Sequence, residues 1–322
     1  MVNGVLVIDK PAGLTSHDVV ARVRRSLRER RVGHTGTLDP FATGVLVLLL
    51  GRATRLAQFL ARVDKEYEAL IRFGYATETG DATGAPRRGP AGADGPMVGS
   101  TRSFSDGEIE AALRALRGEI EQVPPMYSAK KLKGKKLYEL ARRGLEVERQ
   151  AVRVKIHELE AVPHKGGALL LENEDGTRDL SVRVVCSAGT YVRTLAESVG
   201  ERLGVGAHLA ALRRTRAGDF RIQAAVALDE LEEWARGGGG LEKMVLSTNA
   251  ALLRMPSAHL TGEEARAVRH GVAVRAPAGK EAQYVDGEPV RAIDEQGNLL
   301  AVAIYEAETG HLRPRVVLAP EK

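Results

Sequence analysis

A glycine-punctuated loop from Gly33 to Gly44 carries a single acidic residue, Asp39, directly before Pro40. Proline restricts the preceding residue to extended or turn conformations, and the glycines let the loop turn tightly and approach a ligand. A buried strand is predicted directly after the loop, in the apolar run Val45–Leu50. Asp39 can therefore be a carboxylate that a rigid element projects into a cleft. It can equally be an ordinary turn residue, since Asp and Pro are both common in turns.

Arg193 and Tyr67 are the other residues whose positions suggest chemistry. Arg193 falls in the first turn of a helix predicted at about 190–203, where positive charge opposes the helix dipole and favours a carboxylate partner. An exposed arginine without a role would give the same sequence. Tyr67 begins a predicted strand, and the charged Lys65 and Glu66 before it predict an exposed strand end. Its ring can face a cleft or pack against a neighbouring strand.

Other catalytic chemistries lack the residues they need. The segment Gly134-Lys135-Lys136 is missing the upstream glycine and the hydroxyl of a nucleotide-binding loop. Cys186 is the only cysteine, which excludes an intrachain disulfide and a cysteine-based zinc site and favours a reducing cytoplasm. The eight histidines show no metal-ligand spacing, and no apolar run approaches the length of a transmembrane helix. We expect no cofactor, no nucleotide, no metal and no membrane partner.

Positive charge is concentrated in two short stretches of a chain whose net charge is +5. Ala21 to Arg31 holds six Arg and one Glu, and Lys130 to Arg143 holds five Lys, two Arg and one Glu. The rest of the chain is net acidic. Basic stretches of this kind are typical of nucleic-acid-binding surfaces, and also of solvated helix faces.

The elements predicted around these residues form a mixed α/β domain. Thr15 or Ser16 can cap a helix, and Ser105 opens a capping box before another. The segment Asp81–Ser103 is rich in Gly, Ala and Pro and is expected to be a long mobile loop. The remaining predicted elements are a strand at Val5–Asp9, a short helix through Arg55 and Phe59, strands at 151–161, 168–172 and 180–187, and a helix at 228–236.

A change of pattern divides the chain into two expected domains. Four glycines at 237–240 predict a loose junction, and short strands with turn dipeptides such as Asp286-Gly287 predict a small β-rich module after it. The predicted domains are 1–248, with an insertion at about 124–150, and 252–322.

The run Gly33–Gly44 resembles the signature loop of the TruB family of tRNA pseudouridine synthases. Ordered matches over residues 3–216 make this resemblance more specific than any one motif. They are Asn3-Gly4-Val5-Leu6, Asp9-Lys10-Pro11, Asp64-Lys65-Glu66-Tyr67, Thr79-Gly80-Asp81-Ala82-Thr83-Gly84, Pro124-Pro125-Met126-Tyr127-Ser128-Ala129, Gly134-Lys135-Lys136-Leu137-Tyr138-Glu139, Ser187-Ala188-Gly189-Thr190-Tyr191-Val192-Arg193, Gly206-Ala207-His208-Leu209 and Leu212-Arg213-Arg214. The terminal module resembles a PUA domain only loosely.

The resemblance implies a fold, an activity and a set of site residues. The fold is a central, mostly antiparallel sheet with helices, followed by a PUA-like RNA-binding domain. The activity is isomerisation of uridine to pseudouridine in the T arm of tRNA, at uridine 55, after the base is flipped out. Asp39 would be the nucleophile, Arg193 its partner, and Tyr67 would stack on the uracil. The resemblance assigns a further set of residues to substrate or RNA. His34 would fill the space left in the RNA loop, Tyr191 and Leu212 would line the pocket, and Lys10 and Asp81 would bind substrate or RNA. A basic clamp would comprise Lys130, Lys131, Lys133, Lys135 and Lys136.

Two other functions remain compatible with the sequence. An RNA-binding or tRNA-folding factor would also carry basic stretches, although it would not need the set Asp39, Tyr67 and Arg193. An Asp-dependent hydrolase would need a second acid or a metal site, and the sequence offers neither clearly. We expect a cytoplasmic monomer.

Overall fold

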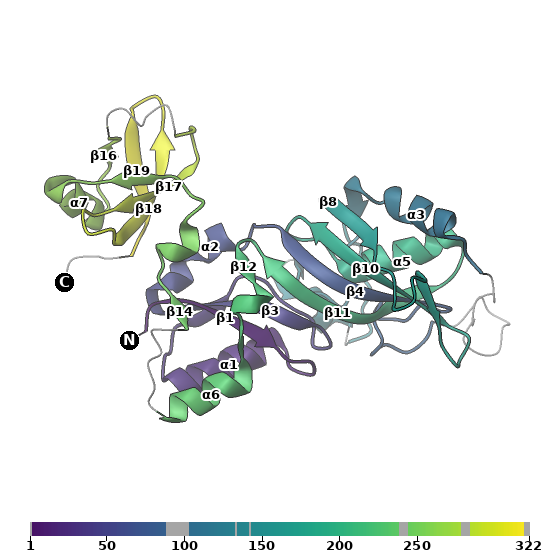
Figure 1. Ribbon diagram of the computed structural model, residues 1–322. Coiled ribbons are helices and arrows are strands. Elements are labelled where there is room, and N and C mark those ends of the chain that lie inside the picture. Colours follow the sequence, from purple (N-terminus) through teal and green to yellow (C-terminus); the bar gives the residue numbers. More distant parts are fainter. Residues whose placement is uncertain are drawn as a thin grey trace.

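The computed structural model describes residues 2–87, 103–132, 134–141, 143–237, 244–277 and 284–318. It contains a large sheet with helices and a separate, smaller β-rich unit at the C-terminal end (Figure 1). Glycines 238–240 and residues 88–102, on which two predictions rest, lie outside the described residues.

The large sheet is mixed, and most neighbouring strands in it are antiparallel, as predicted. Its main path runs in the order β13 (Val226–Ala227), β1 (Gly4–Lys10), β3 (Thr43–Leu50), β11 (Ala207–Ala217), β4 (Lys65–Phe73), β10 (Arg178–Cys186), β8 (Val152–Ala161) and β5 (Gly118–Gln122). Short strands extend this path: β2 (Val32–His34), β9 (Leu170–Glu172), β12 (Phe220–Arg221) and β14 (Val245–Leu246).

At the centre of this sheet, the pairing of β3 with β11 lies next to the Gly33–Gly44 loop. β3 and β11 run parallel and pair only at Thr43 with Arg213 and at Gly44 with Arg214. β11 then pairs antiparallel with β4, and Arg214 lies opposite Tyr67. One row across the sheet therefore joins the end of the Gly33–Gly44 loop to the strand that carries the tyrosine.

Helices with apolar faces pack on the sheet and bury the apolar residues of its central strands. On α1, Val19, Val20 and Val23 lie at helical spacing and pack into the main core. The helices of this unit are α1 (Ser16–Leu27), α2 (Ala57–Leu60), α3 (Asp106–Arg114), α4 (Leu137–Ala141), α5 (Val192–Leu203) and α6 (Leu228–Gly237), with 3₁₀ turns η1 (Gly51–Leu56), η2 (Ile222–Ala224) and η4 (Ala250–Leu252).

The terminal unit is β-rich, as predicted. Its strands follow the order β15 (Ser257–His259), β17 (Pro289–Ile293), β18 (Leu299–Glu306), β19 (His311–Val317) and β16 (Val274–Arg275), and one helix, α7 (Gly262–Arg269), packs on them.

The contact between the two units is apolar, although the glycines at 237–240 predict a loose junction; Gly238 to Gly240 lie outside the described residues, so looseness there stays a prediction. One buried cluster includes Leu56 and Leu60 of the first unit with Leu299 and Leu318 of the second. Arg52 also donates to the Leu318 carbonyl oxygen at 3.0 Å. Packing far from the glycine run decides this contact, so the local composition could not reveal it.

Several local predictions are confirmed. Thr15 caps α1 through a capping box with Asp18, and Ser105 caps α3 in the same way with Glu108. The strands expected at 151–161 and 180–187 and the helices expected at 190–203 and 228–236 are present with small shifts at their ends. The sequence analysis missed β11, the longest strand in the sheet.

Candidate active site

The loop that carries Asp39 connects β2 to β3 and is held from three sides. Ser16, buried at the start of α1, accepts the Leu38 N–H at 2.9 Å and donates to the Leu38 carbonyl at 3.2 Å. Lys10 donates to the Pro40 carbonyl at 3.2 Å. Arg214 donates to the Gly36 carbonyl at 3.1 Å. The carbonyls before and after Asp39 are thus fixed by side chains from three separate elements.

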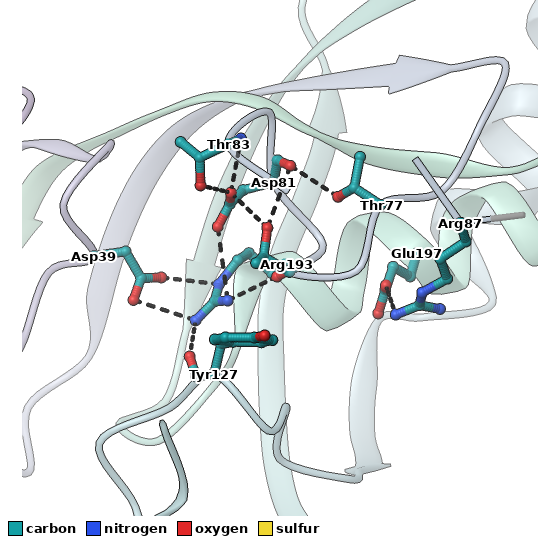
Figure 2. Close-up of polar contacts among 9 residues, drawn as sticks. Asp39, Thr77, Asp81, Thr83, Arg87, Tyr127, Arg193 and Glu197 are labelled. Atoms are coloured by element: carbon teal, nitrogen blue, oxygen red, sulfur yellow. Dashed lines mark hydrogen bonds and ion pairs between the residues drawn. The ribbon is translucent and has the colours of Figure 1, made fainter. Parts of the chain in front are cut away.

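Arg193 binds Asp39 through two parallel contacts (Figure 2). Nε lies 2.9 Å from Oδ2, and Nη2 donates to Oδ1 at 3.2 Å. The remaining N–H groups donate to the carbonyls of Thr79 and Tyr127, each at 2.7 Å. The Arg193 side chain is 5% exposed, so its interpretation as an exposed arginine without a role is wrong. A planar fork holds a carboxylate in one orientation, which a lysine cannot do.

Asp81 lies behind Arg193 rather than on a mobile loop. Its Oδ2 is 3.7 Å from Arg193 Nη1, and Oδ1 accepts hydrogen bonds from Thr79 and Thr83 (Figure 2). The residue is buried and forms a bridge with Leu209 of β11. The expectation of mobility is therefore wrong for the first residues of Asp81–Ser103. A direct contact of Asp81 with RNA is not supported, because its carboxylate faces the guanidinium.

A pocket of about 310 Å³ opens in front of this ion pair. Ligand pockets range from about 300 to 1,000 Å³, so its size suits a single nucleoside better than a larger ligand. Six of the sequence-predicted site residues line it: Asp39, Tyr67, Lys130, Tyr191, Arg193 and Leu212. Lys65, Arg214, the Ser187–Thr190 turn and the Thr35–Leu38 part of the Asp39 loop also line it.

Tyr67 and Lys65 begin β4 inside the protein rather than at an exposed strand end. Lys65 is buried, and its ammonium donates to the carbonyls of Ala61 and Val63. Burial lowers the pKa of Lys65 to about 8. Burial also raises the pKa of the Tyr67 phenol above its usual value, so the phenol is protonated at neutral pH. The expectation of exposure is wrong because β10 and β11 flank this strand.

Two opposing effects act on the charge of Asp39. Desolvation by the surrounding protein raises its pKa, and the Arg193 guanidinium lowers it. The side chain is still 31% exposed to the pocket and accepts two charge-assisted hydrogen bonds. We therefore expect Asp39 to be ionised at neutral pH. We also expect activity to fall, as pH is lowered, at a higher pH than an ordinary aspartate would give.

Lys10 and His34 lie outside the pocket lining. Lys10 is fully buried, and its ammonium donates to the carbonyls of Pro11, Leu14 and Pro40. The assignment of Lys10 to RNA is not supported by this placement, since no part of its side chain is exposed. His34 is partly buried against His17, and burial lowers its pKa to about 4. Its ring is therefore neutral at physiological pH.

Tyr191 and Leu212 close two sides of the pocket. Tyr191 precedes α5, and the buried Gln122 holds its backbone through two hydrogen bonds, at 2.9 and 3.2 Å. Leu212 lies on β11 and is buried. Lys130 borders the pocket, and Lys135 is exposed. The side chains of Lys131, Lys133 and Lys136 lie outside the described part of the structure.

The sequence matches two family models in succession. Residues 24–192 match "TruB family pseudouridylate synthase (N terminal domain)", and residues 193–253 match "tRNA pseudouridylate synthase B C-terminal domain". The tRNA pseudouridine synthase B of Geobacillus thermodenitrificans is 43% identical over 97% of this chain and 98% of its own length. The protein of the same name from Bacillus subtilis is 38% identical over 99% and 98%. The chain belongs to the TruB family of pseudouridine synthases.

A solved structure agrees with this membership. A chain in the crystal structure of a Cbf5-Nop10-Gar1 complex superposes with a TM-score of 0.72 at 28% identity, over 98% of this chain and 85% of the other. The protein is therefore an enzyme of the class that isomerises uridine to pseudouridine. Among the described residues, no group of acidic, histidine or cysteine side chains could hold a metal ion, and no helix is long and apolar enough to cross a membrane.

The first basic stretch of this TruB protein is partly neutralised within the fold. Arg22 of α1 pairs with Asp229 and Glu232 of the acidic helix α6 at 2.9 and 2.6 Å. Arg24 donates to the Val32 carbonyl. The interpretation of this stretch as a nucleic-acid surface is thereby weakened at Arg22 only, because Arg24 bonds a neutral carbonyl and keeps its charge.

Two pocket residues, Lys65 and Arg214, had no role in the sequence analysis. Each lies two positions from a residue that it singled out, Lys65 before Tyr67 and Arg214 after Leu212. The alternation of a strand would have placed Arg214 on the same face as Leu212. This alternation could not be used, because β11 itself was not predicted.

Proposed function

We propose that this enzyme isomerises uridine 55 in the T loop of tRNA and that Asp39 is its nucleophile. The observation that carries the proposal is the doubly hydrogen-bonded Asp39–Arg193 pair at the wall of a nucleoside-sized pocket. The name tRNA pseudouridine synthase B, shared by several relatives, supports tRNA as the substrate.

The reaction breaks the bond between uracil N1 and ribose C1′ and forms a bond between C5 and C1′. The C5 proton leaves and N1 gains a proton, so no redox partner or energy source is needed. An ionised carboxylate attacks either C1′ or the base, and the guanidinium of Arg193 keeps it ionised and oriented. Tyr67 and Leu212 would contact the flipped uracil, and Tyr67, whose phenol is protonated, could accept the C5 proton only while passing its own proton to water or a neighbouring base.

The substrate must leave its stack to reach Asp39, at an unstacking cost of a few kcal/mol. We propose that neutral His34 fills the space that the base leaves in the RNA loop. The basic insertion at about 124–150 and the PUA-like terminal module would hold the RNA backbone outside the pocket. We further propose that the enzyme works in the cytoplasm as a monomer.

The test is tritium release from tRNA labelled at C5 of uridine, with the modified position mapped afterwards. Wild-type protein should release tritium from a single site in the T loop. Asp39→Asn should fold and bind tRNA with unchanged affinity but release none, because the amide is not a nucleophile. Release by a deamidation-free Asp39→Asn would refute the mechanism. An RNA-folding factor would bind tRNA without release in either form, and a hydrolase would cleave without releasing tritium.

A further inference from the structure

The Arg214 side chain is a buried cation without an acidic partner. The residue is 2% exposed, and its guanidinium forms no ion pair with any carboxylate of the described residues. A buried charge without such a partner is costly unless its hydrogen bonds are well satisfied. Its placement therefore needs a reason beyond packing.

Its hydrogen bonds connect the two ends of the Asp39 loop. Nε donates to the Val45 carbonyl on β3 at 2.7 Å, and Nη2 donates to the Gly36 carbonyl at 3.1 Å. Gly36 precedes Asp39 and Val45 follows it. The planar, rigid guanidinium thus links the Gly36 and Val45 carbonyls, which lie on either side of Asp39 in the chain.

The backbone of Arg214 fixes the same assembly from the strand side. It pairs with Gly44 on β3 and with Tyr67 on β4 in the same row of the sheet. Gly44 has a φ of +100°, and a Cβ there would lie 2.2 Å from the Arg214 carbonyl oxygen. Only glycine permits this approach. Arg214 consequently sets the spacing between the Asp39 loop and Tyr67.

We infer that Arg214 is a positioning residue, whose guanidinium fork holds the loop of Asp39 in register with Tyr67 for the reaction. This rests on the proposed role of Asp39 as nucleophile. A displacement of about 1 Å in a reacting group can cost about 100-fold in rate. Loss of the fork should therefore slow the chemical step, while tRNA affinity, which the proposed function assigns mainly to RNA contacts outside the pocket, is retained.

Arg213 is the matched control because it is the next residue on β11 and points the other way. Its side chain is 39% exposed and pairs with Asp9 at 2.7 Å. It contacts neither the loop carbonyls of Gly36 and Val45 nor the pocket lining. Replacing it removes an arginine from the same strand and leaves the Gly36 and Val45 contacts in place; besides the Asp9 pair it loses only a 3.4 Å hydrogen bond to the Thr43 hydroxyl at the end of the Asp39 loop.

The experiment compares Arg214→Lys, Arg214→Met and Arg213→Met in the full-length protein. Single-turnover rates at saturating enzyme, tRNA dissociation constants and thermal midpoints are measured for each. Both Arg214 variants should lose about 100-fold in rate with unchanged tRNA affinity. Lysine should not rescue, because one ammonium group cannot span both carbonyls. Arg213→Met should stay within about fivefold of wild type, as expected for an exposed ion pair.

Three outcomes would overturn the inference. Arg214→Lys with a near-normal rate would show that charge matters and the fork does not. A loss confined to tRNA affinity would make Arg214 an RNA-binding residue. Unfolding of both Arg214 variants at the assay temperature would make it a support of the whole sheet. Asp39→Asn, assayed in parallel, separates these results from a failure of the proposed function, since its activity tests the nucleophile alone.

Discussion

Gly44 and Arg214 face each other across the parallel strands β3 and β11 so closely that a Cβ on Gly44 would lie 2.2 Å from the Arg214 carbonyl oxygen and 2.8 Å from its nitrogen. These two residues close the sheet between the Asp39 loop and β4. Backbone atoms cannot move aside as the end of a flexible side chain can, so the strands must separate if Gly44 gains a side chain.

Gly44→Ala should therefore lower both activity and stability. The positive φ of Gly44 alone costs an alanine about 1 kcal/mol, and the strand separation adds to this. The rate should fall further than the loss of folded protein explains, because the Asp39 loop ends at this residue. Activity per folded molecule, measured well below the thermal midpoint, checks the prediction. Gly13→Ala is the control, since Gly13 has φ +84° but no atom within 4 Å of the added Cβ. Equal effects of the two changes would contradict the role of the close approach.

Arg193→Lys should bind tRNA normally and lose about 100-fold or more in single-turnover rate. Lysine keeps the charge but cannot hold both oxygens of Asp39 together with the Thr79 and Tyr127 carbonyls. Rates and tRNA affinity measured on the same preparation separate orientation from binding. A near-normal rate would mean that charge alone is enough to prepare Asp39.

His34 should make the fold sensitive to acid. Its pKa is lowered to about 4 in the folded protein by burial, against an ordinary value of about 6.5. Between these two pH values His34 is protonated in the unfolded chain and neutral in the folded protein. Stability therefore falls as pH drops from 6.5 to 4, by at most about 1.4 kcal/mol per pKa unit.

His34→Gln should flatten the dependence of stability on pH in that window, as measured by urea unfolding at several pH values. His259→Gln, at an exposed position of the terminal sheet, controls for the loss of a histidine. An unchanged slope in His34→Gln would show that the ring is solvated and not held neutral.

Neutralising Lys130, Lys131, Lys133, Lys135 and Lys136 together should weaken tRNA binding and flatten its salt dependence. Each lost phosphate contact lowers the log–log slope by about 0.7 to 0.9. Replacing Arg22 serves as the comparison, since it is already paired with α6. Equal slopes in wild type and the five-lysine variant would place these lysines in solvent away from RNA.

The sequence revealed most where local chemistry decides the structure. The capping box at Ser105, a cap at Thr15 or Ser16 and the signature loop around Asp39 could all be read directly. Prediction from the sequence failed where pairing between strands far apart in the chain determines the structure. β11 went unnoticed because Arg213, Arg214 and Arg216 interrupt its apolar residues, and Lys65 is buried only because β4 lies between β10 and β11. The burial of a charged side chain depends on partners that come together through long-range pairing, which no local pattern contains.

Removal of the terminal module should affect stability as well as RNA binding, because the two units share an apolar contact. Truncation before Leu252 removes Leu299 and Leu318 from the cluster that also holds Leu56 and Leu60. The exposed apolar surface should lower the thermal midpoint of the remaining protein. Every residue lining the pocket precedes Arg216, so modification of an isolated T-arm hairpin should persist below that midpoint, while affinity for full-length tRNA falls.

Two neighbouring leucines on β18 separate packing from RNA binding in this experiment. Leu299 packs into the cluster shared by the two units, and Leu300 packs into the core of the module itself. Leu299→Ala and Leu300→Ala should each cost about 2 to 5 kcal/mol of local stability. If the module only grips distant RNA, Leu299→Ala should leave hairpin kinetics unchanged at temperatures where the protein is folded. Should Leu299→Ala slow the hairpin reaction while Leu300→Ala does not, the module supports the pocket through the shared cluster, and the proposed division of labour between the units is wrong.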